Sequence, residues 1–431
     1  MLIHAIYNNN SQKLTKQTKQ TKALSIKKIP FLKGEVVLLN IDSLAAGGAG
    51  VSRHKGFVVF TNFTCPGDSV LAKITNIKKN FAQAEIVSIK NPSDKRIVAK
   101  CPVFQKCGGC TWQHILYTEQ LKQKKQILSS SLGKKISFKD EIIKDVIPSP
   151  KEWRYRNRIQ LKIDKNFDYG FYEKKSHNII KIKDCPIADS LLFKDLDKNI
   201  KNHTSLKKNY HNQVEVYISR EKEIKYIISG NKQNKTNKPD KQNNKNKIDK
   251  KAFAQVNEWV NQILIKDILK YLKKHLLPKQ TVYDLYCGHG NFSFPINKIL
   301  NPYKTIGVEL NLSSVQIAKK NALQNNIAGL DFIAKDVKSF LQQCKNINGP
   351  VILDPPRIGC DKAVIESLIK LKPPVILYIS CNPQTLARDL EILIGDNNLY
   401  EPVLAQAYDM FPQTDHVESL IVLKLSPKDI D

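Results

Sequence analysis

One cysteine, Cys381, follows the apolar run at residues 374–380, where its thiol could serve as a nucleophile. The run is typical of a buried strand, so the thiol is expected where that strand ends and a loop begins. A thiolate that adds to carbon 6 of a uracil ring makes carbon 5 enolate-like, and carbon 5 can then attack a sulfonium methyl group. Most lone cysteines are inert buried residues, so this interpretation depends on the surrounding motifs.

A glycine-containing loop at residues 284–291 has the sequence Asp-Leu-Tyr-Cys-Gly-His-Gly-Asn. Its two glycines permit a tight turn and the close approach of backbone to a nucleotide-like ligand. A dinucleotide-binding fingerprint would have a third glycine where Ser293 stands. Asp284 ends the first predicted strand, and Glu309 ends the second, where a carboxylate can accept hydrogen bonds from two ribose hydroxyls. This pair favours S-adenosylmethionine over a dinucleotide.

Two further acidic residues end the next predicted strands. Asp336 could contact the edge of an adenine, or it could be a solvated loop acid. Asp354 begins an Asp-Pro-Pro-Arg sequence, whose consecutive prolines give a rigid, extended loop beside the cofactor's sulfonium. An aromatic residue at the fourth position would indicate methylation of an exocyclic amino group. Arg357 stands there instead and argues for a different acceptor.

A second group of cysteines lies earlier in the chain, at Cys101, Cys107, Cys110 and Cys185. Four thiolates are enough to close either a zinc site or an iron-sulfur cluster, and spacing alone leaves both open. A radical enzyme would keep one iron open by using three cysteines, so four indicate a closed, structural centre. Aromatic and basic neighbours suit RNA by stacking on bases and holding phosphates, with core packing as the alternative for the tryptophans; these neighbours are Trp112, Trp153, Arg154, Arg156 and Arg158.

The elements that must position these residues fall into five segments. The sequence predicts a disordered basic tail (1–30), a small OB-like β-barrel (31–93), a middle domain with the cysteines (94–229), a Lys/Asn-rich linker or insert (230–251) and an α/β domain (252–431). In the barrel segment, short β-rich runs alternate with turn signals, and residues 45–53 are expected to be a glycine-rich loop. The middle segment has a predicted helix at 117–132 and a strand pair at 153–163 and 169–172.

The α/β fold class follows from strand-like runs that alternate with helical patterns. These runs lie at 281–286, 304–309, 330–334, 350–353 and 374–380. Strands separated by helices predict a doubly wound parallel sheet, which binds ligands beyond the carboxyl ends of its strands. The candidate residues of the α/β segment fall at those ends.

Charge and cysteine content restrict the class of protein. Lys and Arg total 69 against 40 Asp and Glu, and the net charge of +29 favours nucleic acid as partner, although genomic drift toward lysine is the alternative cause. Nine cysteines without an apolar leader indicate reduced thiols and a cytoplasmic location. No apolar run is long enough to cross a membrane, and the sequence indicates no obligatory protein partner.

Four motifs taken together resemble the RNA uracil-5 methyltransferases, which have a class I methyltransferase fold. They lie at residues 284–291, 354–357, 380–389 and 409–418. Residues 31–93 look like the TRAM barrel of that family, and the cysteine group is similar to that of its iron-sulfur subgroup. The transfer-RNA branch lacks both, so the chain is more similar to the branch that acts on 23S ribosomal RNA.

The resemblance implies roles for individual residues. Cys381 becomes the nucleophile, and Glu418 becomes the base that removes the carbon 5 proton after methylation. Cofactor contacts are implied for Gln255, Tyr286, Asn291, Glu309 and Asp354. Ligation of a 4Fe-4S cluster is implied for Cys101, Cys107, Cys110 and Cys185.

Several alternatives stay open from the sequence. The predicted barrel, the positive net charge and the cysteine group would also suit a non-catalytic RNA-binding or ribosome-assembly factor. Among enzymes, membership of the transfer-RNA branch is the alternative. Methylation of an exocyclic amine or of protein would not need a thiol. Asp415 and His416 compete with Glu418 as the base, and Cys287 and Cys360 are the next nucleophiles to test.

Overall fold

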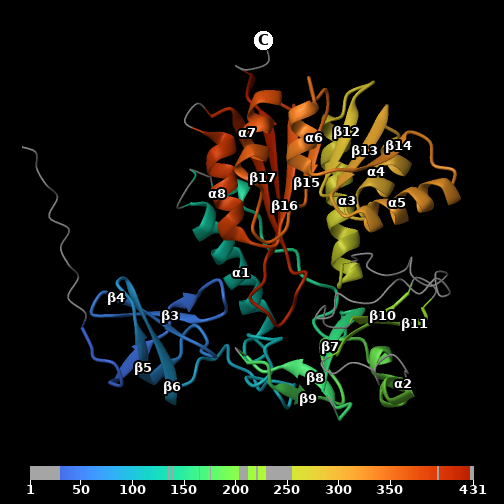
Figure 1. Ribbon diagram of the computed structural model, residues 1–431. Coiled ribbons are helices and arrows are strands. Elements are labelled where there is room, and N and C mark those ends of the chain that lie inside the picture. The colour runs from blue at the N-terminus through green and yellow to red at the C-terminus, as the bar shows by residue number, and fades with distance from the viewer. Residues whose placement is uncertain are drawn as a thin grey trace, which may run out of the picture.

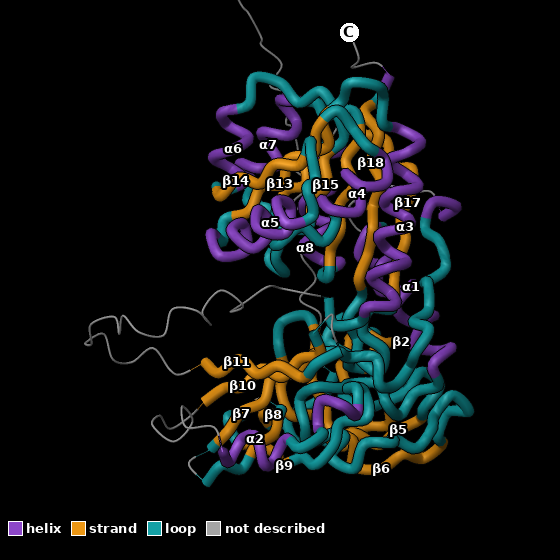
Figure 2. Tube along the Cα trace, turned by 90° about the vertical axis from the view of Figure 1, so that its right-hand side faces the viewer, coloured by secondary structure: helices purple, strands orange, loops and turns teal. Residues whose placement is uncertain are grey.

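The computed structural model describes residues 30–133, 136, 140–164, 166–174, 176–202, 212–219, 222–229, 255–395 and 398–427. A seven-stranded sheet with its helices lies at one end of the molecule, and two smaller sheets lie at the other (Figures 1 and 2). The predicted tail and the Lys/Asn-rich insert lie outside the described residues, apart from Pro30. None of the helices in the described ranges is long and apolar enough to cross a membrane.

The first small sheet has six strands in the order β1-β5-β6-β4-β3-β2. Their bounds are β1 (Val36–Asn40), β2 (Ser43–Leu44), β3 (Gly50–His54), β4 (Phe57–Thr61), β5 (Ser69–Ile77) and β6 (Phe81–Asn91). Buried and partly exposed residues alternate along β4, so side chains such as Phe57 and Val59 form one apolar core. The prediction of a loop throughout 45–53 is wrong, because from Gly50 onward this segment pairs with β4.

The middle sheet has five antiparallel strands in the order β11-β10-β7-β8-β9. Their bounds are β7 (Arg158–Ile163), β8 (Tyr169–Tyr172), β9 (Ile179–Lys181), β10 (Asn212–Ile218) and β11 (Ile224–Ser229). One 3-10 helix (Ser190–Phe193) and α2 (Leu196–Asn202) pack against its buried residues. The strand predicted at 153–163 begins only at Arg158, because residues 154–157 hydrogen bond to other segments of the chain.

The large sheet has the order β14-β13-β12-β15-β16-β18-β17. Its strands are β12 (Thr281–Leu285), β13 (Lys304–Glu309), β14 (Leu330–Ala334), β15 (Val351–Leu353), β16 (Val375–Ser380), β17 (Tyr400–Tyr408) and β18 (Glu418–Leu425). The first five of these are parallel, and β18 lies antiparallel between β16 and β17. The predicted doubly wound parallel sheet is therefore confirmed, with an antiparallel pair added at one edge.

Helices cover both faces of this sheet. They are α3 (Glu258–His275), α4 (Ser293–Leu300), α5 (Leu312–Gln324), α6 (Val337–Gln343), α7 (Lys362–Leu371) and α8 (Pro383–Ile394). Every residue of β16 is buried, and its side chains alternate between two cores. One core contains residues of α6, α7 and α8, and the other contains residues of α3 and α4. Burial on both faces explains why the sequence of β16 is continuously apolar.

One helix of the middle segment belongs to the packing of the large sheet. It is α1 (Tyr117–Leu132), whose predicted bounds are confirmed. Leu128 and Leu132 are fully buried in the same core as α8, and α1 also packs against β17. The following segment, which includes a 3-10 helix (Asp140–Ile142), extends the sheet by bridging to β17. The middle segment is thus anchored to the α/β sheet on both sides of residues 134–139.

Candidate active site and cysteine cavity

The predicted catalytic and cofactor residues of the α/β segment gather at the carboxyl edge of the large sheet. Asp284 lies in β12, Glu309 ends β13, Asp336 follows β14, Asp354 follows β15, and Cys381 follows β16. Because β18 runs antiparallel to β16, its first residue, Glu418, begins at the same edge. This edge faces the two smaller sheets (Figure 1). Open α/β sheets bind their ligands at such an edge.

The glycine loop is held in place by a hydrogen bond to Glu309 and by close packing at Gly290. Gly290 has a φ of +93°, and a Cβ there would lie 2.7 Å from the Phe294 ring, so both conformation and space require glycine. The Gly288 N–H donates to Oε2 of Glu309 at 3.1 Å. Glu309 thus binds the backbone of the glycine loop at its turn. Its other oxygen accepts the N–H of Asn311 at 2.8 Å.

The side chain of Asn291 connects this loop to α3. Its amide lies 3.0 Å from the amide of Asn261, which is in the second turn of the helix. Asn257 caps α3 by accepting the N–H of Val260, and Gln255 stands just before it, 9% exposed. The backbone carbonyl of the intervening Val256 accepts the N–H of Asn157 at 3.0 Å. The middle segment therefore contacts the chain just before α3, next to Gln255, and Asn291 joins α3 to the glycine loop.

The side chains of two predicted cofactor residues are engaged elsewhere in the structure. Tyr286 has a φ of +65°, and its ring packs against the core, where its hydroxyl interacts with Cys360. The ring of Tyr286 is only partly buried, so one part of it faces the core and another part reaches the surface. Asp336 caps α6 by accepting the N–H and hydroxyl of Ser339 at 3.1 and 3.3 Å. The structure thus gives the exposed Asp336 a local structural role.

Among the described residues, two carboxylates at this edge form no ion pair with a cation. Burial raises the pKa of Asp284 to about 7, although its Oδ2 accepts the Ser293 hydroxyl at 2.5 Å. Its Oδ1 is buried without a hydrogen-bond partner among the described residues. Burial, together with the nearby charge of Asp284, also raises the pKa of Asp354 to about 7. Such a pair is suited to a cationic ligand, which would favour the charged forms.

Cys381 and Glu418 occupy opposed positions at the end of two paired strands. Ser380 pairs with Ser419, so one step further toward the edge Cys381, which directly follows β16, lies near Glu418, the first residue of β18. The Ser419 hydroxyl fixes this register by donating to the Ser380 carbonyl at 3.1 Å. Glu418 is only 3% exposed, whereas Cys381 is partly exposed. A thiol and a carboxylate therefore share one small region of the edge.

Burial and the surrounding charges shift the pKa values of both Glu418 and Cys381. Burial, followed by the charge of Asp354, raises the pKa of Glu418 to about 8, while Arg357 acts in the opposite direction. Burial and the charge of Glu418 raise the pKa of Cys381 to about 11, and Arg357 again lowers it. The Arg357 loop is tied to the nucleophile loop, because the side-chain amide of Asn382 donates to the Arg357 carbonyl at 3.0 Å.

The other candidate nucleophiles are less accessible. Cys287 is 5% exposed and packs in the core beside α5, and burial raises its pKa strongly. Cys360 is 6% exposed, and its thiol accepts the Tyr378 hydroxyl at 3.5 Å. Burial raises the pKa of Cys360 to about 12. Cys381 is the cysteine of this set that lies at the carboxyl edge and reaches the surface.

The segment between β17 and β18, residues 409–417, is held by parts of the chain far away in sequence. Lys124 of α1 forms a fully buried ion pair with Asp409 at 2.5 Å. The side chains of Gln413 and Gln120 form a hydrogen bond of 3.0 Å. The Gln413 carbonyl accepts the N–H groups of Thr111 and Trp112. This segment leads directly into Glu418, so these contacts position the carboxylate.

The competitors of Glu418 as the base have other partners. Asp415 accepts the Thr111 hydroxyl at 3.0 Å and the Gly47 N–H at 2.8 Å, which joins this segment to the cysteine segment and to the barrel. His416 packs edge-on against Phe411, and burial lowers its pKa. Asp415 therefore has a structural role in this arrangement.

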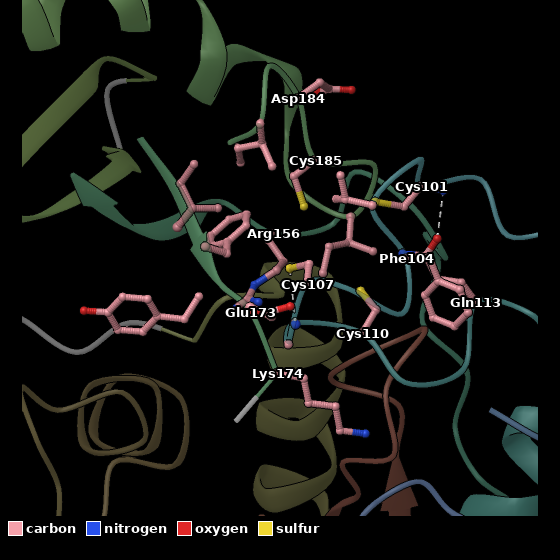
Figure 3. A pocket seen from close by; sticks show the side chains of 18 of the residues that line it. Cys101, Phe104, Cys107, Cys110, Gln113, Arg156, Glu173, Lys174, Asp184 and Cys185 are labelled. Atoms are coloured by element: carbon pink, nitrogen blue, oxygen red, sulfur yellow. Dashed lines mark hydrogen bonds between the residues drawn. The ribbon is translucent and has the colours of Figure 1, made fainter. Parts of the chain in front are cut away.

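The four predicted metal ligands line one cavity of about 440 Å³ (Figure 3). Cys101, Cys107 and Cys110 come from the segment after the barrel, and Cys185 comes from the loop after β9. Backbone contacts join the two sides, because the Gly108 N–H donates to the Tyr172 carbonyl at 3.1 Å. In the described ranges, no three His, Cys, Asp or Glu side chains stand close enough to hold a single metal ion. The four thiols therefore surround a cavity and do not converge on the position of one metal ion.

Burial governs the chemistry of this cavity. It raises the pKa of Cys110 to about 12 and that of Cys185 to about 11, and it raises the pKa of Cys107 as well. Thiols in such surroundings become thiolates only when a strong positive charge, such as a metal, compensates them. Arg156 also lines the cavity, and its Nε is buried without a hydrogen-bond partner among the described residues. A soft donor set with this added cation fits an anionic iron-sulfur cluster.

Protein-family models match two parts of the chain. A sequence model of the family described as tRNA (uracil-5-)-methyltransferase matches residues 190–426, which is more than half of the chain. The chain belongs to this family. It is accordingly an S-adenosylmethionine-dependent RNA (uracil-5-)-methyltransferase, as the motifs indicated. A second model, that of the TRAM domain, matches residues 30–87, so the predicted TRAM barrel is confirmed.

Relatives of the methyltransferase match it along most of its length. A Bdellovibrio bacteriovorus protein described as an uncharacterized RNA methyltransferase is 36% identical over 405 residues, covering 92% of this chain and 97% of the relative. A Protochlamydia amoebophila protein with the same description is 34% identical over 429 residues, covering 89% and 96%. The crystal structure of Pyrococcus abyssi tRNA (uracil-54, C5)-methyltransferase with S-adenosyl-L-homocysteine has a TM-score of 0.65 at 24% identity, covering 89% of this chain and 100% of that one. This likeness shows the shared fold.

Sequence reasoning missed several residues that build the methyltransferase site. Asn261 contacts Asn291, and Lys124 holds Asp409. Asp409 begins one of the family motifs, which was a usable signal. Nothing in the sequence connected it to Lys124, which is 285 residues away.

Proposed function

We propose that the methyltransferase modifies carbon 5 of a uridine in 23S ribosomal RNA, with Cys381 as covalent nucleophile and Glu418 as base. The observation that supports this most directly is the opposition of Cys381 and Glu418 across β16 and β18. Both lie at the edge that carries Asp284 and Asp354. We infer a cytoplasmic location, where the nine cysteines would stay reduced.

In the proposed mechanism, the Cys381 thiolate forms a bond to carbon 6 of the uracil, and the ring electrons move to carbon 5 and oxygen 4. S-adenosylmethionine supplies the methyl group as an electrophile. Glu418 then takes the proton from the tetrahedral carbon 5, and the electron pair of that C–H bond restores the ring double bond. The C6–S bond breaks, and Cys381 leaves as thiolate. With a pKa of about 8, the Glu418 carboxylate is a stronger base than an ordinary carboxylate once it has lost its own proton.

We propose that Gln255, Tyr286, Asn291, Glu309 and Asp354 hold the cofactor, with Asp336 as a further contact to the adenine edge. Glu309 and Asn291 surround the glycine loop, which supports this assignment. Tyr286 packs against the core but is only partly buried, so its side chain can still contribute. Asp336 could do so only with the part of its carboxylate that does not cap α6.

We propose that Cys101, Cys107, Cys110 and Cys185 hold a 4Fe-4S cluster, and that the methyltransferase belongs to the iron-sulfur branch of its family. A cavity of about 440 Å³ around four thiols supports a polynuclear centre over a single zinc ion. The centre would stabilise the middle segment. We also propose that the described chain divides into domains at 31–93, 94–229 and 252–431. The methyl-transfer steps do not involve it.

A transfer-RNA substrate is the second candidate, favoured by the description of the family and by the fold shared with the Pyrococcus abyssi enzyme. Mapping of 5-methyluridine in cells with and without the gene decides between the two. Loss of one or more 5-methyluridines from 23S ribosomal RNA, with transfer RNA unchanged, is the expected result. Loss confined to transfer RNA would contradict the ribosomal assignment.

A further inference from the structure

A second cavity, of about 590 Å³, lies beside the cysteine cavity, with which it shares residues of its wall. Its lining combines one tryptophan, four cations and one carboxylate. These are Trp153, Lys100, Arg154, Lys181, Lys183 and Asp184. Its volume falls within the range of roughly 300 to 1,000 Å³ that is typical of pockets for small ligands. Nothing in the methyl-transfer mechanism uses it.

The structure separates Trp153 from the other aromatic and basic residues that the sequence assigned to RNA. Trp112 is fully buried, and its Nε1 donates to the Gly48 carbonyl at 3.1 Å, so it is a core residue. Arg158 pairs with Glu215 at 3.2 Å. Trp153 instead lies in the cavity wall, and the ammonium of Lys100 lies over its ring, 4.9 Å from the ring centroid. A partly exposed ring with a cation held against it combines the two groups that recognise a nucleotide, a stacking surface and a phosphate partner.

The wall that carries Trp153 is held by several hydrogen bonds of Arg154. Arg154 adopts a left-handed conformation, with a φ of +55°. Its guanidinium makes two hydrogen bonds to Asp184, at 2.6 and 2.5 Å, and donates to the carbonyls of Cys185 and Ala188. Arg154 is thus neutralised within the wall, and it fixes the backbone of its neighbour Trp153 before any ligand binds.

Two lysines supply the remaining charge. Lys181 pairs with Asp168 at 2.5 Å, which engages it outside the cavity. Lys100 and Lys183 are exposed, and within the described part of the chain neither pairs with a carboxylate. After the Arg154 and Asp184 charges cancel, the cavity retains two cations that have no carboxylate partner among the described residues, and one of them, Lys100, lies over the aromatic ring.

We propose that this cavity binds one unpaired nucleotide of the RNA substrate, with its base stacked on Trp153 and its phosphate held by Lys100 and Lys183. The proposal rests on the proposed function for its substrate, and it adds a binding site away from Cys381. Lys100 directly precedes Cys101, and Asp184 directly precedes Cys185. Two of the proposed metal ligands thus hold two walls of the nucleotide site, which gives the cysteine centre a part in RNA binding.

The test measures binding of a fluorescein-labelled single-stranded oligouridylate of about ten nucleotides, a length within the usual site size for single strands, by anisotropy with the full chain. Trp153→Ala should weaken binding roughly tenfold, because a stacked base is lost, and Trp153→Phe should stay within about threefold of the unchanged protein. Lys183→Glu should weaken binding and make the slope of log K against log salt less steep by about 0.7. Lys320→Glu is the matched control, because it makes the same charge change on the exposed side of α5 and should bind within about twofold.

Equal affinity of the Trp153→Ala variant and the unchanged protein would overturn the proposal, and so would an equal effect of Lys183→Glu and Lys320→Glu. Binding of S-adenosylhomocysteine by each variant, measured by calorimetry, should be unchanged, and its loss in Trp153→Ala would mean a structural role instead. Covalent trapping with saturating 5-fluorouridine RNA separates this site from the proposed function. Trp153→Ala should still form the adduct, whereas absence of the adduct in the unchanged protein would contradict the Cys381 chemistry and leave the binding comparison valid.

Discussion

Lys124 and Asp409 form an ion pair of 2.5 Å in which both side chains are fully buried. The ammonium also donates to the Phe411 carbonyl at 3.0 Å, so one lysine of α1 holds two points of the segment that leads to Glu418. The second oxygen of Asp409 has no hydrogen-bond partner among the described residues. Among the described residues, Lys124 is therefore the cation that compensates the buried charge of Asp409.

We expect Lys124→Met to lower the free energy of unfolding by about 3 to 5 kcal/mol, because it leaves the Asp409 carboxylate buried without a cation. Adding Asp409→Asn should recover part of this loss, since the uncompensated charge is then removed. Urea denaturation measures both. Lys125→Met is the matched control, because the neighbouring lysine pairs with Asp145 on the surface and its loss should have little effect. A double variant less stable than Lys124→Met would contradict this account.

Affinity for S-adenosylhomocysteine should increase as pH rises through about 7. The reason is that burial raises the pKa of Asp284 and of Asp354 to about 7, and we propose that the ligand's ammonium group favours their ionised forms. Binding should release protons below this pH, which calorimetry in two buffers of different ionisation enthalpy detects. Asp284→Asn should bind more weakly and with a flatter pH profile. A profile unchanged by this substitution would exclude Asp284 as the titrating group.

RNA that contains 5-fluorouridine should form a covalent adduct with the methyltransferase, because fluorine cannot leave carbon 5 as a cation. The adduct should survive a denaturing gel and contain Cys381. Cys381→Ala should form none, whereas Cys360→Ala should form it at a comparable rate, since that thiol is buried against Tyr378. Continued methylation by Cys381→Ala would show that the nucleophile is another residue.

Glu418→Gln should permit addition and methyl transfer but block removal of the carbon 5 proton. Methylated RNA would then accumulate on the enzyme, to about one equivalent, because elimination needs a base. In the unchanged enzyme this step should become faster as pH rises through about 8, where the Glu418 carboxyl loses its proton. Normal turnover by the variant, without trapped RNA, would assign the proton to water or to another group.

Anaerobically purified protein should be brown and contain about four irons per chain. Removal of the iron, or Cys110→Ser, should weaken binding of oligouridylate much more than binding of S-adenosylhomocysteine, because the cysteines support the wall at Trp153 rather than the glycine loop. Metal analysis and calorimetry measure these quantities. Colourless protein with one zinc per chain would contradict the cluster.

The sequence predicted best what depends on local pattern. The continuous apolar run of β16 and the bounds of α1 follow from periodicity, and the acids at strand ends follow from parallel topology. β3 was missed because the glycines within residues 45–53 suggested a loop, whereas pairing with β4 decides the conformation from Gly50 onward. The partners of Asp409 and Asp415 were also missed. They lie on segments that meet only in the folded chain, and periodicity carries no information about such contacts.

The hydrogen bond between Thr111 and Asp415 joins residues that are 304 positions apart in the sequence. This separation affects the order in which the protein folds during its synthesis. At roughly 5 to 20 residues per second, a ribosome needs roughly 15 to 60 s to reach Asp415 after it has made Thr111. During that time the barrel and the cysteine segment can fold, but Gly47, Thr111 and Lys124 wait for the last strand pair. Their polar groups stay in water until the C-terminal part of the chain emerges. Assembly of the catalytic edge is therefore one of the last events of synthesis, and a chain truncated before residue 409 should leave the three sheets unjoined at this edge.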